Sequence, residues 1–266
     1  MGVFHCTWMN NIGANNYPSR DYYYLTKSYK GSSVTLCESI DELRANRCYM
    51  HLPLKYAYYG TGHTIYKDYM FYTQDSSQYL ISHPIKAFKS SEEGDEETRQ
   101  IAIPDDAECC DTKNPLYSVK HSGFFDFEID ENGLWLIYKK KINQTEISDY
   151  SNDIYVIAKI NENYYKDLKI AQKWILKIKH NNVANMFIAC GQLYALKNTV
   201  NSPASIYKLC DLLNDSDCSK TETDSFNITI SSRQLTSLSY NTEKKLLYMV
   251  DGGSFVYYNL ETVRIN

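Results

Sequence analysis

The sequence has few of the features that mark fibrous, disordered, membrane-spanning or nucleic-acid-binding chains. Its 266 residues include only 11 glycines and 6 prolines, which excludes a collagenous or Gly/Pro-rich disordered chain. A net charge of -4 lacks the basic excess that neutralises a phosphate backbone, so nucleic acid is not expected as a partner. Apolar runs such as residues 187–190 and 246–250 are far shorter than the roughly 20 residues that span a bilayer. We therefore predict a globular protein without direct membrane insertion.

What dominates instead is a series of short apolar and aromatic runs separated by turn residues, a pattern typical of strands. Residues 64–72 predict a hairpin with a two-residue turn. Residues 124–138 predict another hairpin, in which Asn132 and Gly133 supply the positive φ angles of a tight turn. A short helix that begins at a capping box at Ser39 is the main exception. The sequence thus predicts an all-β fold rich in tyrosine, of which there are 25.

The predicted hairpins recur along the chain at a spacing of roughly 50 to 65 residues, which is the size of a propeller blade. They begin near Gly62, Phe124, Met186 and Ser237. By this count the chain holds about five blades and forms one domain over residues 1–266. Because the spacing is irregular, a double-sheet all-β fold remains the alternative on pattern alone.

Several segments, in the right order, resemble the olfactomedin domain family. Residues 125–138 resemble its most recognisable segment, which reads roughly D-x-x-V-D-E-x-G-L-W-x-I-Y. Residues 183–194 resemble the family's A-N-A-F-x-x-C-G-x-L-Y, and residues 237–248 resemble M-I-D-Y-N-P followed by K-x-L-Y. Upstream, residues 60–81 are similar to its G-T-G-x-V-V-Y-N-G-x-L-Y-Y stretch. The resemblance spans most of the chain, from about residue 60 to residue 260.

This resemblance implies a five-bladed β-propeller, in agreement with the blade count. It also implies a secreted or cell-surface, non-enzymatic module of adhesion or signalling, with an extracellular or cell-surface protein as its partner. The N-terminus has no signal peptide. We interpret the chain as a fragment, or as a gene model that lacks its beginning, with the loss of the extreme N-terminal strand left open. An intracellular all-β protein is a further alternative.

The resemblance also implies a calcium ion in the central channel. Many relatives hold it with a strand Asp, an Asn together with the next carbonyl, and a carbonyl followed by a second Asp. Carried over by position, these are Asp126, then Asn185 with Met186, then Leu238 with Ser239. A serine therefore stands where the family usually has an aspartate. Since calcium affinity depends on the number of charged ligands, we expect a weakened site, with a polar or water-filled channel as the alternative.

Glu128 offers one way to restore the missing charge. It lies two residues from Asp126, so on a strand both side chains point to the same face. A second interpretation of this segment, as the calcium loop of a helix-loop-helix motif, fails because Lys139 stands where a bidentate Glu is required.

The eight cysteines contain no Cys-x-x-Cys motif, and no Cys/His spacing suits structural zinc. Two pairs are close enough for local disulfides: Cys37 with Cys48, and Cys210 with Cys218. The adjacent Cys109 and Cys110 are expected to pair outward or stay free. From the resemblance, Cys190 matches a family cysteine whose partner lies ahead of the first blade; here that partner is Cys6, or it is absent.

Three sequons predict a glycoprotein: Asn143, Asn214 and Asn227. Asn143 follows a basic run in a predicted loop and is the best candidate. Asn227 lies in a strand-like stretch, so a buried or unmodified side chain is the alternative there.

No signature of a common enzyme is present. The sequence has no Gly-x-Ser-x-Gly elbow, no phosphate-cradling glycine loop and no dinucleotide fingerprint, and its six histidines are scattered. Some propellers use two channel carboxylates for glycoside hydrolysis, but no pair is singled out for it here. We predict no catalytic residues, and keep a propeller glycosidase or carbohydrate-binding lectin as the alternative function.

Overall fold

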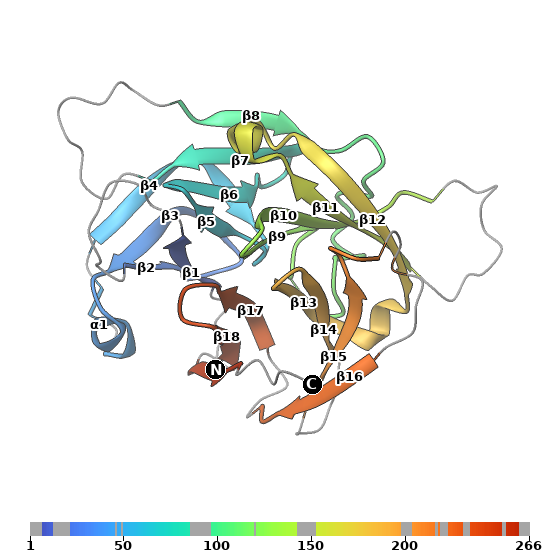
Figure 1. The fold of residues 1–266 in the computed structure, drawn as a ribbon. Coiled ribbons are helices and arrows are strands. Elements are labelled where there is room, and N and C mark those ends of the chain that lie inside the picture. The colour runs from blue at the N-terminus through green and yellow to red at the C-terminus, as the bar shows by residue number, and fades with distance from the viewer. Residues whose placement is uncertain are drawn as a thin grey trace.

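The computed structural model describes residues 7–12, 22–45, 47–48, 50–85, 97–119, 121–142, 153–197, 204–215, 218, 223–230, 235–251 and 254–260. Within these ranges the regular structure is almost entirely β, with one short α-helix, α1 (Ile40–Arg44), and two 3-10 turns, η1 (Glu162–Asp167) and η2 (His180–Asn182). The sheets radiate from a common axis as the blades of a propeller (Figure 1).

The strands form five blades, and within each blade the strands follow one another along the chain from the inner edge outward. Blade 1 consists of β1 (Thr7–Ile12), β2 (Tyr23–Thr26), β3 (Lys30–Cys37) and β4 (Met50–Tyr59). Blade 2 consists of β5 (Thr64–Tyr66), β6 (Tyr69–Thr73), β7 (Tyr79–Pro84) and β8 (Arg99–Ala102). Blade 3 consists of β9 (Phe125–Asp130), β10 (Gly133–Lys139), β11 (Asp153–Ile160) and β12 (Ile170–Ile178).

Blade 4 consists of β13 (Val183–Ala189), β14 (Gln192–Lys197), β15 (Ala204–Asp211) and β16 (Thr223–Ile228). In the described residues, blade 5 has three strands, β17 (Leu235–Asn241), β18 (Leu246–Asp251) and β19 (Ser254–Asn259). Neighbouring strands within each blade are antiparallel. Between blades, β1 and β5 form a short parallel pairing, which joins blades 1 and 2 into one continuous sheet. The five-bladed propeller is therefore confirmed, and the double-sheet alternative is excluded.

The core lies between the blades and uses the tyrosines that the composition singled out. Trp135 of β10 and Trp174 of β12 pack with ring centroids 5.6 Å apart on one face of blade 3. The hydroxyl of buried Tyr155 donates to the Leu116 carbonyl at 2.8 Å, and that of Tyr72 donates to a carbonyl at 3.0 Å. A tyrosine can therefore fill the space between blades while its polar end finds a partner, which suits stacked sheets.

Three disulfides lie within the described residues. Cys37 is joined to Cys48, and Cys210 to Cys218. Cys109 and Cys110 are joined to each other, so the expectation that they pair outward or stay free was wrong. Cys190, the remaining described cysteine, lies in the turn between β13 and β14. Cys6 lies outside the described residues.

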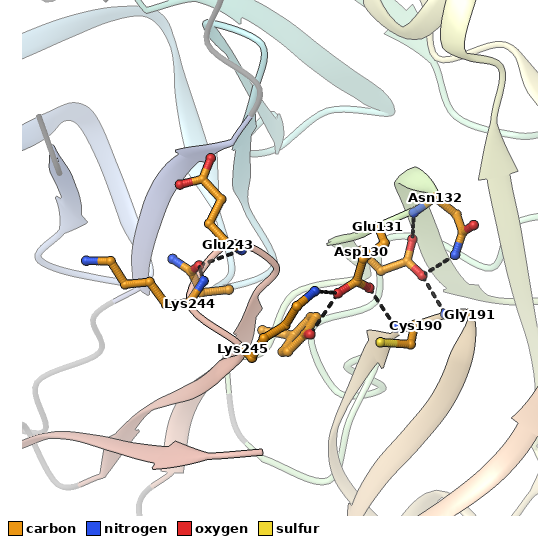
Figure 2. A network of polar contacts seen from close by, with 10 residues as sticks. Asp130, Glu131, Asn132, Cys190, Gly191, Glu243, Lys244 and Lys245 are labelled. Carbon is orange, nitrogen blue, oxygen red and sulfur yellow. Dashed lines mark hydrogen bonds and ion pairs between the residues drawn. The ribbon is translucent and has the colours of Figure 1, made fainter. Parts of the chain in front are cut away.

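The turn between β9 and β10 links blade 3 to blade 4 (Figure 2). Asp130 accepts hydrogen bonds from the Asn132 backbone at 2.8 Å and from the Trp135 indole at 2.7 Å, which fixes the turn. The same carboxylate accepts from the Gly191 backbone at 2.7 Å. Gly191 has φ +74°, a conformation that favours glycine, and a Cβ there would also collide with the Leu213 side chain.

Glu131, in the same turn, extends the connection to blade 5. It accepts from the Cys190 backbone at 2.8 Å and from the Tyr240 hydroxyl at 2.8 Å, and it forms an ion pair with Lys245. Burial alone would raise the pKa of Glu131, but the hydrogen bonds from Lys245, Tyr240 and the backbone outweigh it and lower the pKa to about 2. One carboxylate thus holds the inner ends of three blades together.

Because the folded-state pKa of Glu131 is depressed, its stabilising contribution is present above the unfolded pKa of about 4.3 and is lost as the pH falls toward 2. We predict that Glu131→Gln lowers the melting temperature at pH 7 by about 2 to 4 °C. We also predict that the variant loses less stability than the wild type between about pH 5 and pH 2. Thermal melts across this pH range measure both effects.

Asp167→Asn is the matched control, since Asp167 forms a largely exposed ion pair with Arg99 and exposed pairs contribute little. An acid-stability profile of Glu131→Gln that is parallel to the wild-type profile would contradict the role assigned to Glu131.

Candidate channel site

A small cavity of about 30 Å³ lies where the inner strands meet. Its walls include Asp126 and Glu128 from β9, Asn185 from β13, and Leu238 and Ser239 from β17. A void needs only about 10 to 15 Å³ on this measure to hold one water. The cavity therefore has room for a single ion or one to two waters.

The sequence-predicted channel residues come together from three different blades. Asp126, Asn185, Leu238 and Ser239 all line the cavity. Met186 follows Asn185 on β13, and its side chain is buried in the hydrophobic core cluster that includes Trp135. Only its main-chain carbonyl was expected to contribute, and that contribution stays a prediction.

The position of β9 is fixed by close backbone packing against the segment before β5. The Gly62 carbonyl accepts a hydrogen bond from the Phe127 backbone at 3.3 Å. A Cβ on Gly62 would lie 2.7 Å from both the Asp126 Cα and its Oδ1, so no larger residue fits without displacing that carboxylate. Glycine at this position is thus one reason why Asp126 reaches the channel.

Asp126 and Glu128 are both almost fully buried, with 5% and 4% of their surface exposed. Burial raises the pKa of Asp126 to about 7, even though the Tyr117 hydroxyl donates to its Oδ2 at 2.7 Å and acts in the opposite direction. Burial, and then the negative charge of Asp126, raise the pKa of Glu128 well above its ordinary value. The two carboxyl groups therefore resist ionising together unless a cation joins them.

Among the described residues, no lysine or arginine forms an ion pair with either carboxylate. His63 also lines the cavity, but burial lowers its pKa to about 3, so it carries no positive charge near neutral pH. The described part of the chain thus supplies two acidic groups and no charge to balance them.

Asn185 adds a second indication that the cavity takes a ligand. Its side chain is 7% exposed, and its Oδ1 has no hydrogen-bond partner in the described residues. An unsatisfied buried carbonyl costs stability that a bound cation or water would recover. Two carboxylates, an amide oxygen and nearby carbonyls form an oxygen-rich set that fits a hard cation such as calcium. Within the described residues, no group of three or more His, Cys, Asp or Glu side chains is arranged to hold a metal.

Sequence reasoning missed two channel residues, Tyr117 and His63. Tyr117 lies in the irregular segment before β9, and its hydrogen bond to Asp126 depends on how that segment folds back. His63 precedes β5 and contacts Thr26 of blade 1, with Nε2 and Oγ1 3.4 Å apart. Tyr117 belongs to no local motif, and His63 stands at the variable position after Gly62 in its motif, so no sequence signal marked either residue.

The remaining predicted modification sites lie away from the channel. Asn214 is exposed in the turn after β15, where its amide donates to Asp211 at 3.0 Å. Asn227 is exposed on the outer strand β16. Asn143 lies outside the described residues. Cys190 is exposed and forms no disulfide with another described cysteine. Glycosylation of the sequons and a Cys6–Cys190 pair stay predictions.

Comparison with known proteins places the chain among the olfactomedin-like proteins. It is 27% identical over 219 residues to olfactomedin-like protein 3A of Danio rerio, covering 79% of this chain and 48% of that protein. It is 26% identical to olfactomedin-like protein 3B of Danio rerio and 24% identical to olfactomedin-like protein 3 of Xenopus laevis. These matches cover 77% and 78% of this chain, and 45% and 47% of those proteins. The chain thus spans less than half the length of these relatives.

Among solved structures, the β-propeller domain of Myceliophteria thermophila Cps50 (Swd1) aligns with a TM-score of 0.41 and 11% identity, over 90% of this chain and 80% of that one. The propeller assignment rests on the sheets themselves and not on this likeness. In the described residues, no helix has the length and apolar character needed to cross a bilayer. The family model for the olfactomedin-like domain matches residues 2–265. The chain therefore belongs to the olfactomedin-like domain family.

Proposed function

We propose that this chain is an extracellular protein-interaction module of adhesion or signalling, without catalytic activity, whose channel serves the rigidity of the propeller. Membership of the olfactomedin-like domain family carries this proposal, and its non-catalytic part is supported by the size of the channel cavity. At about 30 Å³ it admits an ion or water, whereas pockets that bind small organic molecules measure roughly 300 to 1,000 Å³. The two channel carboxylates therefore have no room for a sugar ring between them, which argues against glycoside hydrolysis at this site.

Family membership and the disulfides support an extracellular setting. The relatives that match are olfactomedin-like proteins. The Cys37–Cys48 and Cys210–Cys218 disulfides suit an oxidising compartment, because cytosolic thiols are kept reduced. The intracellular alternative predicts free thiols at these positions in protein from its native source.

Within this proposal, calcium is the ion best suited to the channel. Asp126 and Asn185 would hold it through side-chain oxygens, together with the Met186 and Leu238 carbonyls and Ser239. A bound calcium would neutralise the carboxylates and join β9, β13 and β17, which belong to three blades. Ser239 brings no charge, so the affinity is expected to be lower than in a site with an aspartate at this position.

We predict that calcium raises the melting temperature of the protein and that a chelator lowers it, because a ligand bound only to the folded state adds RT ln(1 + [L]/Kd) of stability. At a hundredfold excess over Kd this amounts to about 2.7 kcal/mol. Ser239→Asp is expected to increase calcium affinity, measured by titration calorimetry. Ser225→Asp, on the exposed strand β16, is the control. An unchanged affinity in Ser239→Asp would mean that residues 238–239 do not line the ion site.

The interaction function is tested by binding of the purified propeller to cells. We predict saturable binding that protease treatment of the cells removes and that glycosidase treatment leaves intact. The opposite pattern would favour the lectin alternative.

One feature of the surface favours the carbohydrate-binding alternative, so the tests include that alternative. A hollow of about 720 Å³ at the rim is bordered by Tyr79, Asp105 and Glu108, and Tyr79 is 43% exposed. An exposed ring beside carboxylates is the kind of surface on which a sugar could stack. We predict no glycan-array signal and no turnover of a glycoside substrate panel. Glycan binding lost in Tyr79→Ala, or turnover lost in a folded Asp126→Asn variant, would contradict the proposed function.

A further inference from the structure

The channel charges are distributed differently from the pattern that the resemblance implies. In that pattern one acidic ligand comes from the β9 position of Asp126 and the other from the β17 position of Ser239. Here Ser239 is neutral, while Glu128 adds a carboxylate on the same strand as Asp126. The number of acidic side chains at the cavity is thus two, as in the family pattern, but both come from one blade.

We propose that Glu128 is the second acidic ligand of the channel ion and replaces the charge that Ser239 does not provide. This inference rests on the proposed calcium site and names a ligand that the family pattern lacks. The site would then consist of two carboxylates from β9, a neutral amide oxygen from β13 and neutral oxygens from β17.

The geometry of β9 supports this assignment. Positions 126 and 128 are separated by one residue, so the pleat directs both side chains to one face. In the register of blade 3, Asp126 pairs with Ile137 and Glu128 with Trp135, so they occupy successive positions on one face of β9. Both carboxylates line the same cavity.

The burial of Glu128 argues for a ligand as well. Its side chain is 96% buried, and within the described residues it takes part in no hydrogen bond or ion pair. Burying an unpaired carboxylate is costly, and a packed apolar residue at this position would avoid that cost. A bound ligand would therefore explain why an acidic residue occupies position 128.

Asn185 provides an independent observation from another blade. Its unpartnered Oδ1 borders the same cavity and offers a third oxygen. Two negative charges with neutral oxygens match a hard divalent cation of the calcium type, and the total charge of the occupied site would be zero.

Titration calorimetry with calcium chloride on four proteins tests the assignment: the wild type, Glu128→Gln, Ser239→Asp and the double variant. Glu128→Gln is expected to lower calcium affinity at least about tenfold, because it removes one of two charged ligands and keeps the shape. Ser239→Asp should raise the affinity far more in the Glu128→Gln background than in the wild type, since there it restores the second charge. Glu162→Gln is the matched control and should leave the affinity unchanged, because Glu162 pairs with Lys67 and does not line the cavity.

Melting temperatures separate this assignment from general destabilisation. Without calcium, Glu128→Gln should be at least as stable as the wild type, because it removes an unpaired buried charge next to Asp126. With saturating calcium, the order should reverse. A variant that merely disturbs packing would be less stable under both conditions.

The inference is overturned if Glu128→Gln binds calcium as tightly as the wild type, or if Ser239→Asp raises the affinity equally in both backgrounds. If the wild type binds no calcium at all, both this assignment and the channel ion are wrong. The cell-binding measurement then shows separately whether the proposed interaction function stands.

Discussion

Two acidic side chains buried at the axis of the propeller, without a counter-charge from the described chain, are the constraint on which the site depends. Folding removes Asp126 and Glu128 from water, and neither carboxylate forms an ion pair with a lysine or arginine of the described residues. Carboxylates buried in this way must be protonated or bound by a cation. The unpartnered oxygen of Asn185, on a different blade, borders the same space. A channel cation would therefore connect blades that otherwise meet through side-chain packing.

A second polar connection lies at the inner ends of the same strands and uses only the chain's own groups. Glu131 accepts hydrogen bonds from blades 4 and 5 and pairs with Lys245, while Asp130 holds the turn and reaches Gly191 (Figure 2). Asp130 and Glu131 thus find several hydrogen-bond and ion-pair partners within the protein. Asp126 accepts one hydrogen bond, from Tyr117, and neither Asp126 nor Glu128 has a cationic partner in the described residues. The contrast explains why we assign a structural role to the first pair and ligand binding to the second.

Much of the fold could be predicted because it follows from local patterns. Strand-length apolar runs and the predicted turn after Asp130 identified blade 3, although Gly133 has a positive φ and Asn132, for which one was also expected, does not. Blade-sized spacing together with the family resemblance indicated the propeller. Asp126 and Asn185 were found through motifs of adjacent residues. Tyr117 was not, because its contact with Asp126 depends on an irregular segment folding back onto β9. The Cys109–Cys110 pairing was also mispredicted, because eight cysteines allow 105 connectivities and their spacing does not choose among them.

The central claim is that the channel holds a cation through both carboxylates of β9. A crystal structure of the protein grown with calcium, with anomalous diffraction data, tests it most directly. We expect an anomalous peak on the propeller axis, about 2.3 to 2.6 Å from carboxylate oxygens of both Asp126 and Glu128. A channel that contains only water at saturating calcium would contradict it, as would an ion that Asp126 binds while Glu128 points away.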